Sequence, residues 1–213
     1  MKTRDRIIAT ALNLFNEVGY GTVTTASLAE HLGMAEGNLW YHFKTKRTLL
    51  DAIGERYAVT FEARLGLLPQ GDPVEAYARL LAAIMAELRD YRFLYRDQPA
   101  YGDHAAVIAD HVEDWIRRTY RQFEAHFAAL VSAGALDLPA ERLHDLAVNT
   151  SILLRYGLEH ERELGLATAS GTGAVRRTLL RHLSLFDHAL APQALAHLRS
   201  AIDRIEVDTP LAA

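Results

Sequence analysis

The 213-residue sequence contains no cysteine. Without thiols it can form neither a disulfide nor a thiolate metal site, and such a composition fits a reducing compartment. It also lacks an apolar run approaching the ~20 residues that span a bilayer. Its first residues, MKTRDRIIATAL, carry charges where a signal peptide has its apolar segment. We therefore expect a cytoplasmic protein with no membrane partner.

Signatures of catalysis are scarce as well. The sequence shows no nucleotide-binding loop, nucleophile elbow or His-Glu-x-x-His zinc motif. Its ten histidines raise the alternative of a di-iron helical bundle, which needs two Glu-x-x-His elements and further carboxylates on facing helices. We find one such element, Glu141 to His144, and no second. We expect no enzyme, no metal and no cofactor.

Alternating patterns typical of β-strands are rare, whereas apolar residues recur at helical spacing. We therefore predict an all-α fold of about nine to ten helices, with a frayed tail at 207–213. A break at 67–73 is marked by Asp72 as a helix cap and Pro73 at the first helical position. The predicted helices cover 7–18, 25–32, 36–43, 46–67, 73–90, 104–133, 139–162, 173–190 and 192–206, with a short irregular helix at 91–101.

Charge is distributed unevenly along the chain. The net charge of −4 is unfavourable for binding DNA, because phosphate neutralisation by Lys and Arg supplies most non-specific affinity. Residues 1–50, however, hold six basic and four acidic side chains, whereas the remainder holds 17 and 23. This asymmetry permits nucleic-acid binding only at the N-terminal end.

The second and third predicted helices are short and are joined by Gly33-Met34-Ala35, which is helix-turn-helix spacing. Such a unit exposes the N-terminal face of its third helix to a DNA major groove. Glycine-linked helix pairs also occur as ordinary connectors, so the spacing alone leaves both interpretations open. A stable trihelical unit would bury one apolar set: Ile8, Leu12, Phe15, Leu28, Leu32, Leu39 and Phe43.

The segment 23–50, VTTASLAEHLGMAEGNLWYHFKTKRTLL, resembles the N-terminal signature of the TetR/AcrR family of bacterial transcription regulators. In that signature a Thr/Ser helix start precedes an Ala-x-x-hydrophobic-Gly turn and a Leu-aromatic-Tyr-His-Phe-Lys-x-Lys run. The matching residues are Thr24, Thr25, Leu28, Ala29, Leu32, Gly33, Gly37, Leu39, Trp40, Tyr41, His42, Phe43, Lys44, Lys46 and Leu49. Beyond residue 50 the resemblance lies in length and helix order.

The resemblance implies a helix-turn-helix DNA-binding domain at 1–47 and a helical effector-binding and dimerisation domain at 48–206. It implies DNA contacts from Thr24, Thr25, Glu36, Gly37, Asn38, Trp40, Tyr41, His42 and Lys46.

The chemistry of these residues divides them into two groups. Tyr41, His42 and Lys46 are expected to hold the DNA backbone. Asn38 is expected to read bases, because its amide can form two hydrogen bonds with adenine. Three positions each keep two interpretations. Thr24 either binds phosphate or only caps its helix. Glu36 either accepts a hydrogen bond from the cytosine amino group or only complements the helix dipole. Trp40 stacks on the DNA or packs inward.

In the second domain the resemblance implies a homodimer formed by the last two long helices. The expected interface residues are Leu143, Leu146, Ile152, Leu153, Leu179, Leu183 and Phe186; the alternative is that these stripes pack within one subunit. Aromatic rings with a few polar tips suit either a small-molecule pocket or a packed core. The expected pocket residues are Tyr77, Met85, Tyr91, Phe93, Trp115, Thr119, Phe123, Asn149 and Tyr156.

The expected function is a repressor that binds a palindromic operator as a homodimer. A small apolar or aromatic effector would release it, through linkage between two binding sites. The alternative from a different class is a structural helical adaptor that uses its N-terminal region for protein contacts. Activation in place of repression also stays open, because the sequence locates DNA contacts and not the response of polymerase.

Overall fold

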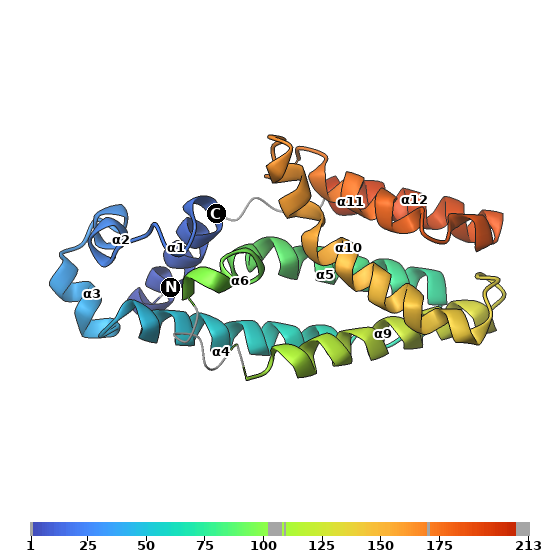
Figure 1. The fold of residues 1–213 in the computed structure, drawn as a ribbon, viewed down its shortest axis with the longest axis horizontal. Coiled ribbons are helices and arrows are strands. Elements are labelled where there is room, and N and C mark those ends of the chain that lie inside the picture. The colour runs from blue at the N-terminus through green and yellow to red at the C-terminus, as the bar shows by residue number, and fades with distance from the viewer. Residues whose placement is uncertain (1, 102–107, 109, 170, 208–213) are drawn as a thin grey trace. The chain divides into compact units, whose positions relative to one another are not determined.

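The computed structural model describes residues 2–101, 108, 110–169 and 171–207 (Figure 1). Within these residues the chain forms helices and turns and no β-strand; Leu136 and Leu190 make an isolated antiparallel bridge. The predicted all-α fold is confirmed. No described helix combines the length and the apolar character needed to cross a membrane. The predicted frayed tail lies outside the described residues, except for Val207.

The N-terminal helices follow the predicted pattern closely. Helix α1 covers Thr3–Val18, α2 Thr25–His31, α3 Glu36–His42 and α4 Lys46–Leu65. Helix α1 ends at Gly19, whose φ of 93° lies in the region that favours glycine. Gly33, with φ of 63°, lets the chain turn between α2 and α3.

The middle of the chain begins with α5 (Pro73–Asp90), where the Asp72 carboxylate accepts the Glu75 N–H at 2.8 Å as predicted for a cap. The irregular helix expected near 91–101 consists of α6 (Arg92–Arg96) and α7 (Gln98–Tyr101). Helix α9 covers Val112–Ser132. Its predicted start at 104 falls among residues 102–107, which lie outside the described part.

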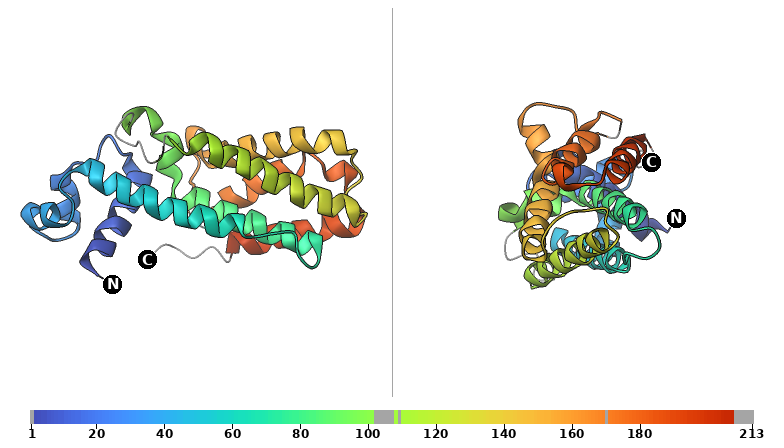
Figure 2. Two further views of the ribbon diagram at one scale, coloured as in Figure 1. Left: turned by 90° about the horizontal axis from the view of Figure 1, so that it is seen from below. Right: turned by 90° about the vertical axis from the view of Figure 1, so that its right-hand side faces the viewer.

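The C-terminal helices are α10 (Leu143–Glu163), α11 (Ala174–Leu183) and α12 (Pro192–Val207). Short 3₁₀ turns cover Ala140–Arg142 and Asp187–Ala189. Helix α11 is shorter than predicted because the backbone leaves helical geometry at Phe186, which buries its ring against Tyr77 and Phe127. Helix α11 packs on both α10 and α12, and Figure 2 gives two further views of these helices.

Two compact units divide the chain. One contains Met1–Glu62 and Glu87–Glu113, and the other contains Ala63–Ala86 and Asp114–Ala213. Helix α4 therefore contributes most of its length to the first unit, whereas most of α5 belongs to the second. The boundary predicted after residue 47 separates the DNA-binding domain from the effector-binding domain. It is defined by which residues contact DNA, so the division into compact units does not test it, and it stays a prediction.

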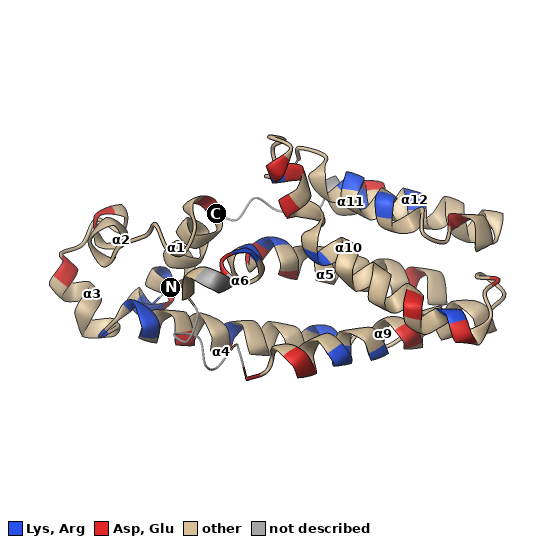
Figure 3. Cartoon of the chain, viewed as in Figure 1, with Lys and Arg blue, Asp and Glu red and all other residues tan. Residues whose placement is uncertain are grey.

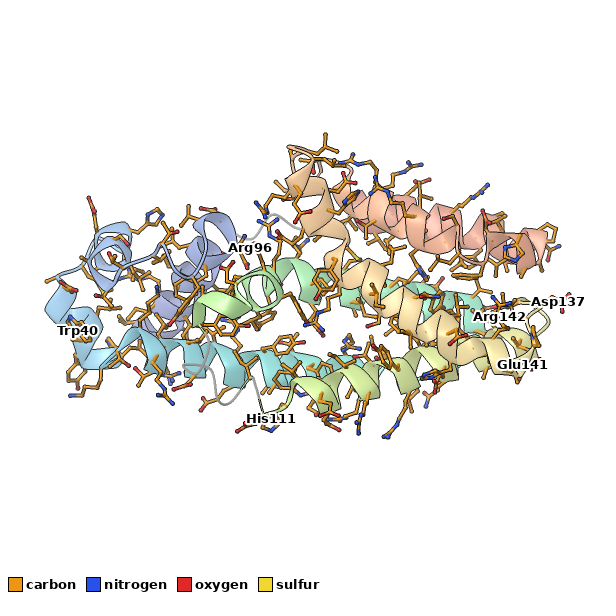
Figure 4. The ribbon with its side chains drawn as sticks, viewed as in Figure 1. Trp40, Arg96, His111, Asp137, Glu141 and Arg142 are labelled. Atoms are coloured by element: carbon orange, nitrogen blue, oxygen red, sulfur yellow. The ribbon has the colours of Figure 1, made fainter. Side chains whose placement is uncertain are left out.

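In the first unit, α6 satisfies the backbone at the end of α1. The Arg96 guanidinium donates to the carbonyl oxygens of Phe15 at 2.6 Å and Asn16 at 2.8 Å, and Arg92 donates to the latter at 2.9 Å. The Asn16 side chain accepts the Phe93 N–H at 2.9 Å. Figure 4 labels Arg96 on α6 beside α1. A helix C-terminus leaves carbonyls without intrahelical partners, and cations stabilise that end.

In the second unit, α10 and α11 approach very closely at one point. A β-carbon added at Gly157 would lie 2.9 Å from Thr178 Oγ1 and closer still to the Thr178 methyl group. One turn further along α10, the buried Glu161 carboxylate accepts from Arg177 at 2.7 Å and also from Arg181. The hydrogen bond from Arg177 lowers the pKa of Glu161. These two ion pairs join α10 and α11 within one chain.

The close approach predicts that Gly157→Ala destabilises the protein, although alanine is the better helix former. We expect the free energy of unfolding to fall by about 1–3 kcal/mol, because the added methyl group has no space. Thr178→Ala alone should cost little through its hydroxyl, which is buried without a hydrogen bond. The double variant should recover most of the loss in urea denaturation; a Gly157→Ala protein as stable as wild type would contradict this packing.

Candidate nucleic-acid interface

Helices α1, α2 and α3 form the predicted trihelical packing. Leu28, Leu39 and Phe43 are buried, as are Ile8 and Phe15 from α1. Leu12 is also buried, whereas Leu32 is only half-buried at the end of α2. This core turns one side of α3 inward and leaves its other side on the surface.

Thr24 is committed to its own helix. Its hydroxyl oxygen accepts the Ser27 N–H at 3.0 Å, and the Ser27 hydroxyl oxygen accepts the Thr24 N–H at 3.0 Å. These reciprocal bonds form a capping box, which sets the start of α2. The capping role left open for Thr24 is therefore present in the structure.

Thr25 and Glu36 bond to each other, which their separation in sequence did not suggest. The Thr25 hydroxyl donates to the Glu36 carboxylate at 2.7 Å, joining the first residue of α2 to the first residue of α3. Both groups are then engaged within the protein. Glu36 nevertheless stays exposed, so its second oxygen is open to a further donor.

The remaining predicted residues of α3 lie on the surface. Gly37 and Asn38 are exposed, and Tyr41 is 83% exposed. Trp40, labelled on α3 in Figure 4, is 38% exposed, so its ring does not pack into the core. His42 is half-buried, and its ring meets the edge of Tyr41 with 5.3 Å between centroids.

Lys46, predicted to contact the DNA backbone, has partners inside the first unit. Its ammonium donates to the Tyr20 carbonyl oxygen and lies 4.0 Å from the centroid of the Tyr20 ring. Burial lowers its pKa, while the nearby Asp97 carboxylate acts in the opposite direction. The ammonium expected to meet phosphate is thus bonded within the unit in this structure, and its contact with DNA stays a prediction.

Two other cations stand at the start of α4. Lys44 and Arg47 are exposed, and Figure 3 shows this end of the helix in blue. Thr45 caps the helix, since its hydroxyl accepts the Thr48 N–H at 3.1 Å. Neither Lys44 nor Arg47 is among the contacts predicted from the sequence, although Lys44 belongs to the matching motif and Arg47 follows Lys46 directly.

The expected pocket residues divide between the two units. Tyr77, Met85, Trp115 and Phe123 are buried in the second unit, and Thr119 is half-buried there.

Tyr91 and Phe93 belong to the first unit, where their rings pack on Tyr57 and Phe15 at 5.1 and 5.2 Å between centroids. Asn149 is exposed and Tyr156 is 51% exposed. These two do not face a protein interior, because they lie on the outer side of α10.

The sequence did not predict the buried polar side chains near Tyr77. The Tyr77 hydroxyl lies 2.6 Å from His182 Nε2, and both side chains are fully buried. Burial lowers the pKa of His182 to about 3, so this ring is neutral at physiological pH. His126 bonds the Leu67 carbonyl at 2.9 Å, and its pKa is lowered by burial. Histidines at helical spacing gave no signal that distinguishes these buried rings from surface ones.

The expected dimer residues also lie in different environments. Leu143, Leu146, Leu179, Leu183 and Phe186 are buried within the single chain. They are core residues, because α10 and α11 are apolar on more than one side and their own subunit covers those sides. Ile152 is 52% exposed and Leu153 is half-buried, so only these two retain apolar surface.

Comparison with known proteins agrees with this geometry. Residues 7–53 match the family of bacterial regulatory proteins called tetR, and residues 56–198 match the bacterial transcriptional repressor model TetR. The Escherichia coli tetracycline repressor protein class C is 52% identical over 52 residues, which are 24% of each chain. The class A repressor from transposon 1721 is 37% identical over 91 residues, 43% of this chain and 40% of that protein. The matches thus span about a quarter to two fifths of these relatives.

Solved structures extend the likeness to the whole fold. A TetR-family regulator from Marinobacter aquaeolei VT8 superposes with a TM-score of 0.80 at 24% identity, covering 96% of this chain and 99% of that one. A transcriptional regulator from Saccharomonospora viridis in complex with choline has a TM-score of 0.66 at 23% identity, covering 88% and 96%. Because the two family models together match most of its length, this chain belongs to the TetR family of bacterial transcriptional regulators.

Proposed function

We propose that this chain is a repressor that binds a palindromic DNA operator as a homodimer and leaves it when a small apolar or aromatic effector binds. One observation carries the proposal: the short helix α3 buries Leu39 and presents Asn38, Trp40 and Tyr41 on its outer side. A major groove admits a helix of this kind, and exposed polar and aromatic side chains can read base edges there. DNA of a bacterium lies in the cytoplasm, which is therefore the proposed location.

Base readout is assigned to the outer side of α3. The Asn38 amide can both donate to and accept from adenine, which gives it a preference for A·T pairs. Trp40 offers an apolar face to a thymine methyl group or a sugar. A β-carbon added at Gly37 would meet no atom within 4 Å, so this position leaves open space for the close approach of DNA. Glu36, held by Thr25, can accept from cytosine with its second oxygen.

Backbone contacts are assigned to exposed groups around α3. Tyr41 supplies a phenolic donor, His42 a ring N–H, and Lys44 and Arg47 supply positive charge. Thr24 is left out of this proposal, since its hydroxyl oxygen accepts the Ser27 N–H in the capping box. The first 50 residues carry the positive balance that such contacts require.

Selection of binding sites from random duplex DNA tests the operator. We expect enrichment of two inverted half-sites, and affinity that falls steeply with salt because counterions are released. Asn38→Ala should change the preferred bases at one position of each half-site, at a cost of about 1–3 kcal/mol there. Lys44→Ala, the matched control, should weaken all sites alike. No enrichment and no binding at low salt would instead favour a helical adaptor.

The dimer surface is proposed on the outer side of α10. Ile152 and Tyr156 are each about half exposed there, and Asn149 and His160 continue the same stripe at helical spacing. Leu153 borders it and is half-buried. A stripe of this kind suits two-fold pairing with a second copy of the chain. The dimer then has two helix-turn-helix units, one for each half-site of a palindrome. The surface thus contains residues predicted for both the dimer and the pocket.

Charge placed on this stripe should separate the dimer. We expect Ile152→Glu combined with Tyr156→Glu to give monomers in sedimentation analysis, with the helical content of wild type because both side chains are exposed in the single chain. Val59→Glu is the matched control, since Val59 is an apolar residue 71% exposed on α4. A double variant that stays dimeric would place the interface elsewhere.

The effector site is proposed in the second unit, among the buried rings of Tyr77, Trp115 and Phe123. Thr119 adds a polar group beside them: its hydroxyl is within 3.0 Å of the Arg64 guanidinium. Rings with few polar partners favour an apolar or aromatic ligand. Two structural neighbours are described as a γ-butyrolactone receptor and as a regulator in complex with choline, which supports a small-molecule site in this fold.

A thermal-shift screen of apolar and aromatic compounds should find ligands that raise the melting temperature. Such a ligand must weaken operator binding by the same factor by which operator weakens ligand binding. The two tryptophans, Trp40 and Trp115, form a matched pair. Trp115→Leu should reduce ligand affinity and spare operator affinity, and Trp40→Leu should do the reverse; unequal linkage factors would contradict the mechanism.

A further inference from the structure

The segment between α1 and α2 is held at Tyr20 by two opposite charges. The Tyr20 N–H donates to Asp97 Oδ2 at 2.6 Å, and the Tyr20 carbonyl oxygen accepts from the Lys46 ammonium. Asp97 is the C-cap of α6, and Lys46 is the first residue of α4. Two helices far apart in sequence therefore hold the two polar groups of one residue.

Aromatic packing fixes the same residue. The Tyr20 ring is buried and meets Phe15 at 5.1 Å and Tyr101 at 5.9 Å between centroids. The Lys46 ammonium lies over both the Tyr20 ring, at 4.0 Å, and the Phe15 ring, at 5.6 Å. A cation above two rings and bonded to a carbonyl is attracted from several directions, and this holds the lysine in one position.

Tyr20 lies where it can set the positions of α2 and α3. Val23, three residues later, is buried, and Thr24 begins the capping box of α2. The chain from Gly19 to Thr24 therefore sets where α2 starts relative to α1. Because α2 carries α3 through the Thr25–Glu36 bond and their shared core, a shift at Tyr20 would displace the side of α3 that faces DNA.

We propose that Lys46 and Asp97 are positioning residues for DNA binding: together they hold the Tyr20 backbone and so the placement of α2 and α3, and Lys46 does not bind phosphate. This inference rests on the proposed DNA-binding function. It also assigns Asp97 a role that its charge alone would not suggest, since an acidic group near DNA normally weakens binding.

Any substitution of Asp97 also changes the contacts of the adjacent Arg96. Its guanidinium bonds Asp97 at 2.6 Å and also the Phe15 and Asn16 carbonyl oxygens. Loss of the Asp97 carboxylate leaves these carbonyl bonds in place. Asp97→Ala thus removes the acceptor for the Tyr20 N–H while α6 keeps its attachment to α1.

The salt dependence of operator binding distinguishes positioning from phosphate contact. Each neutralised phosphate contributes about 0.9 to the slope of log affinity against log salt. Lys46→Met should lower affinity about tenfold at every salt concentration with an unchanged slope, the effect of losing roughly one hydrogen bond to a charged group. Lys44→Ala, the exposed control, should make the slope shallower by about 2 for a dimer. Lys46→Arg should restore part of the affinity.

The change in DNA affinity caused by Asp97→Ala has opposite signs under the positioning role and under a purely electrostatic role. Positioning predicts about tenfold weaker binding, and a double variant with Lys46→Met no weaker than either single change. An electrostatic role alone predicts tighter binding, because a negative charge is removed. Tighter or unchanged binding by Asp97→Ala, or a slope reduced by Lys46→Met as by Lys44→Ala, would overturn the proposal.

Amide hydrogen exchange of the free protein separates this inference from the proposed function. Loss of either charged group should speed exchange at the Tyr20 amide at least tenfold, while amides in α10 and α11 keep their wild-type protection. If wild type bound no DNA, this local change would still be seen, and only the proposed function would fail. Unchanged protection at Tyr20 in Asp97→Ala would show that the carboxylate does not hold it.

Discussion

The backbone at the end of α1 must find hydrogen-bond partners outside its own helix, and this requirement shapes the first unit. The Asn16 carbonyl accepts from Arg92 and Arg96, and the Asn16 side chain accepts the Phe93 N–H of α6. Arg96 also donates to the Phe15 carbonyl, which already accepts the Gly19 N–H. A buried carbonyl without a partner costs about 1–3 kcal/mol. The short helix α6 is therefore a structural part of the N-terminal unit, although it follows α5 in sequence.

This attachment fixes the position of the residues proposed to contact DNA. The exposed side of α3 can be rich in groups that contribute nothing to stability, because the opposite side is anchored through α2, Tyr20 and α1. Tyr41 is the clearest case, with a ring left almost wholly in solvent. The proposed DNA contact would give this exposed ring a partner.

Much of this organisation could be predicted from the sequence. Helical periodicity and cap residues located nearly all the described helices, and the motif around Trp40 identified the surface side of α3. The direction of Lys46 could not be predicted, because a lysine at a helix start looks the same whether it faces phosphate or a carbonyl from residue 20. Periodicity also cannot say which neighbour covers an apolar side, and for this reason the sequence predicts Phe186 in a dimer interface and Tyr156 in a pocket.

The attachment of α6 to α1 has a consequence for the design of hybrid regulators. A chimera joined after residue 47 would pair a foreign α1 with the native α6, so the bond from the Phe93 N–H to the Asn16 side chain and the contact between the Phe15 and Phe93 rings would be lost. A graft that carries residues 87–101 together with the N-terminal helices keeps those bonds intact. In this protein the transferable DNA-binding module is therefore discontinuous in sequence.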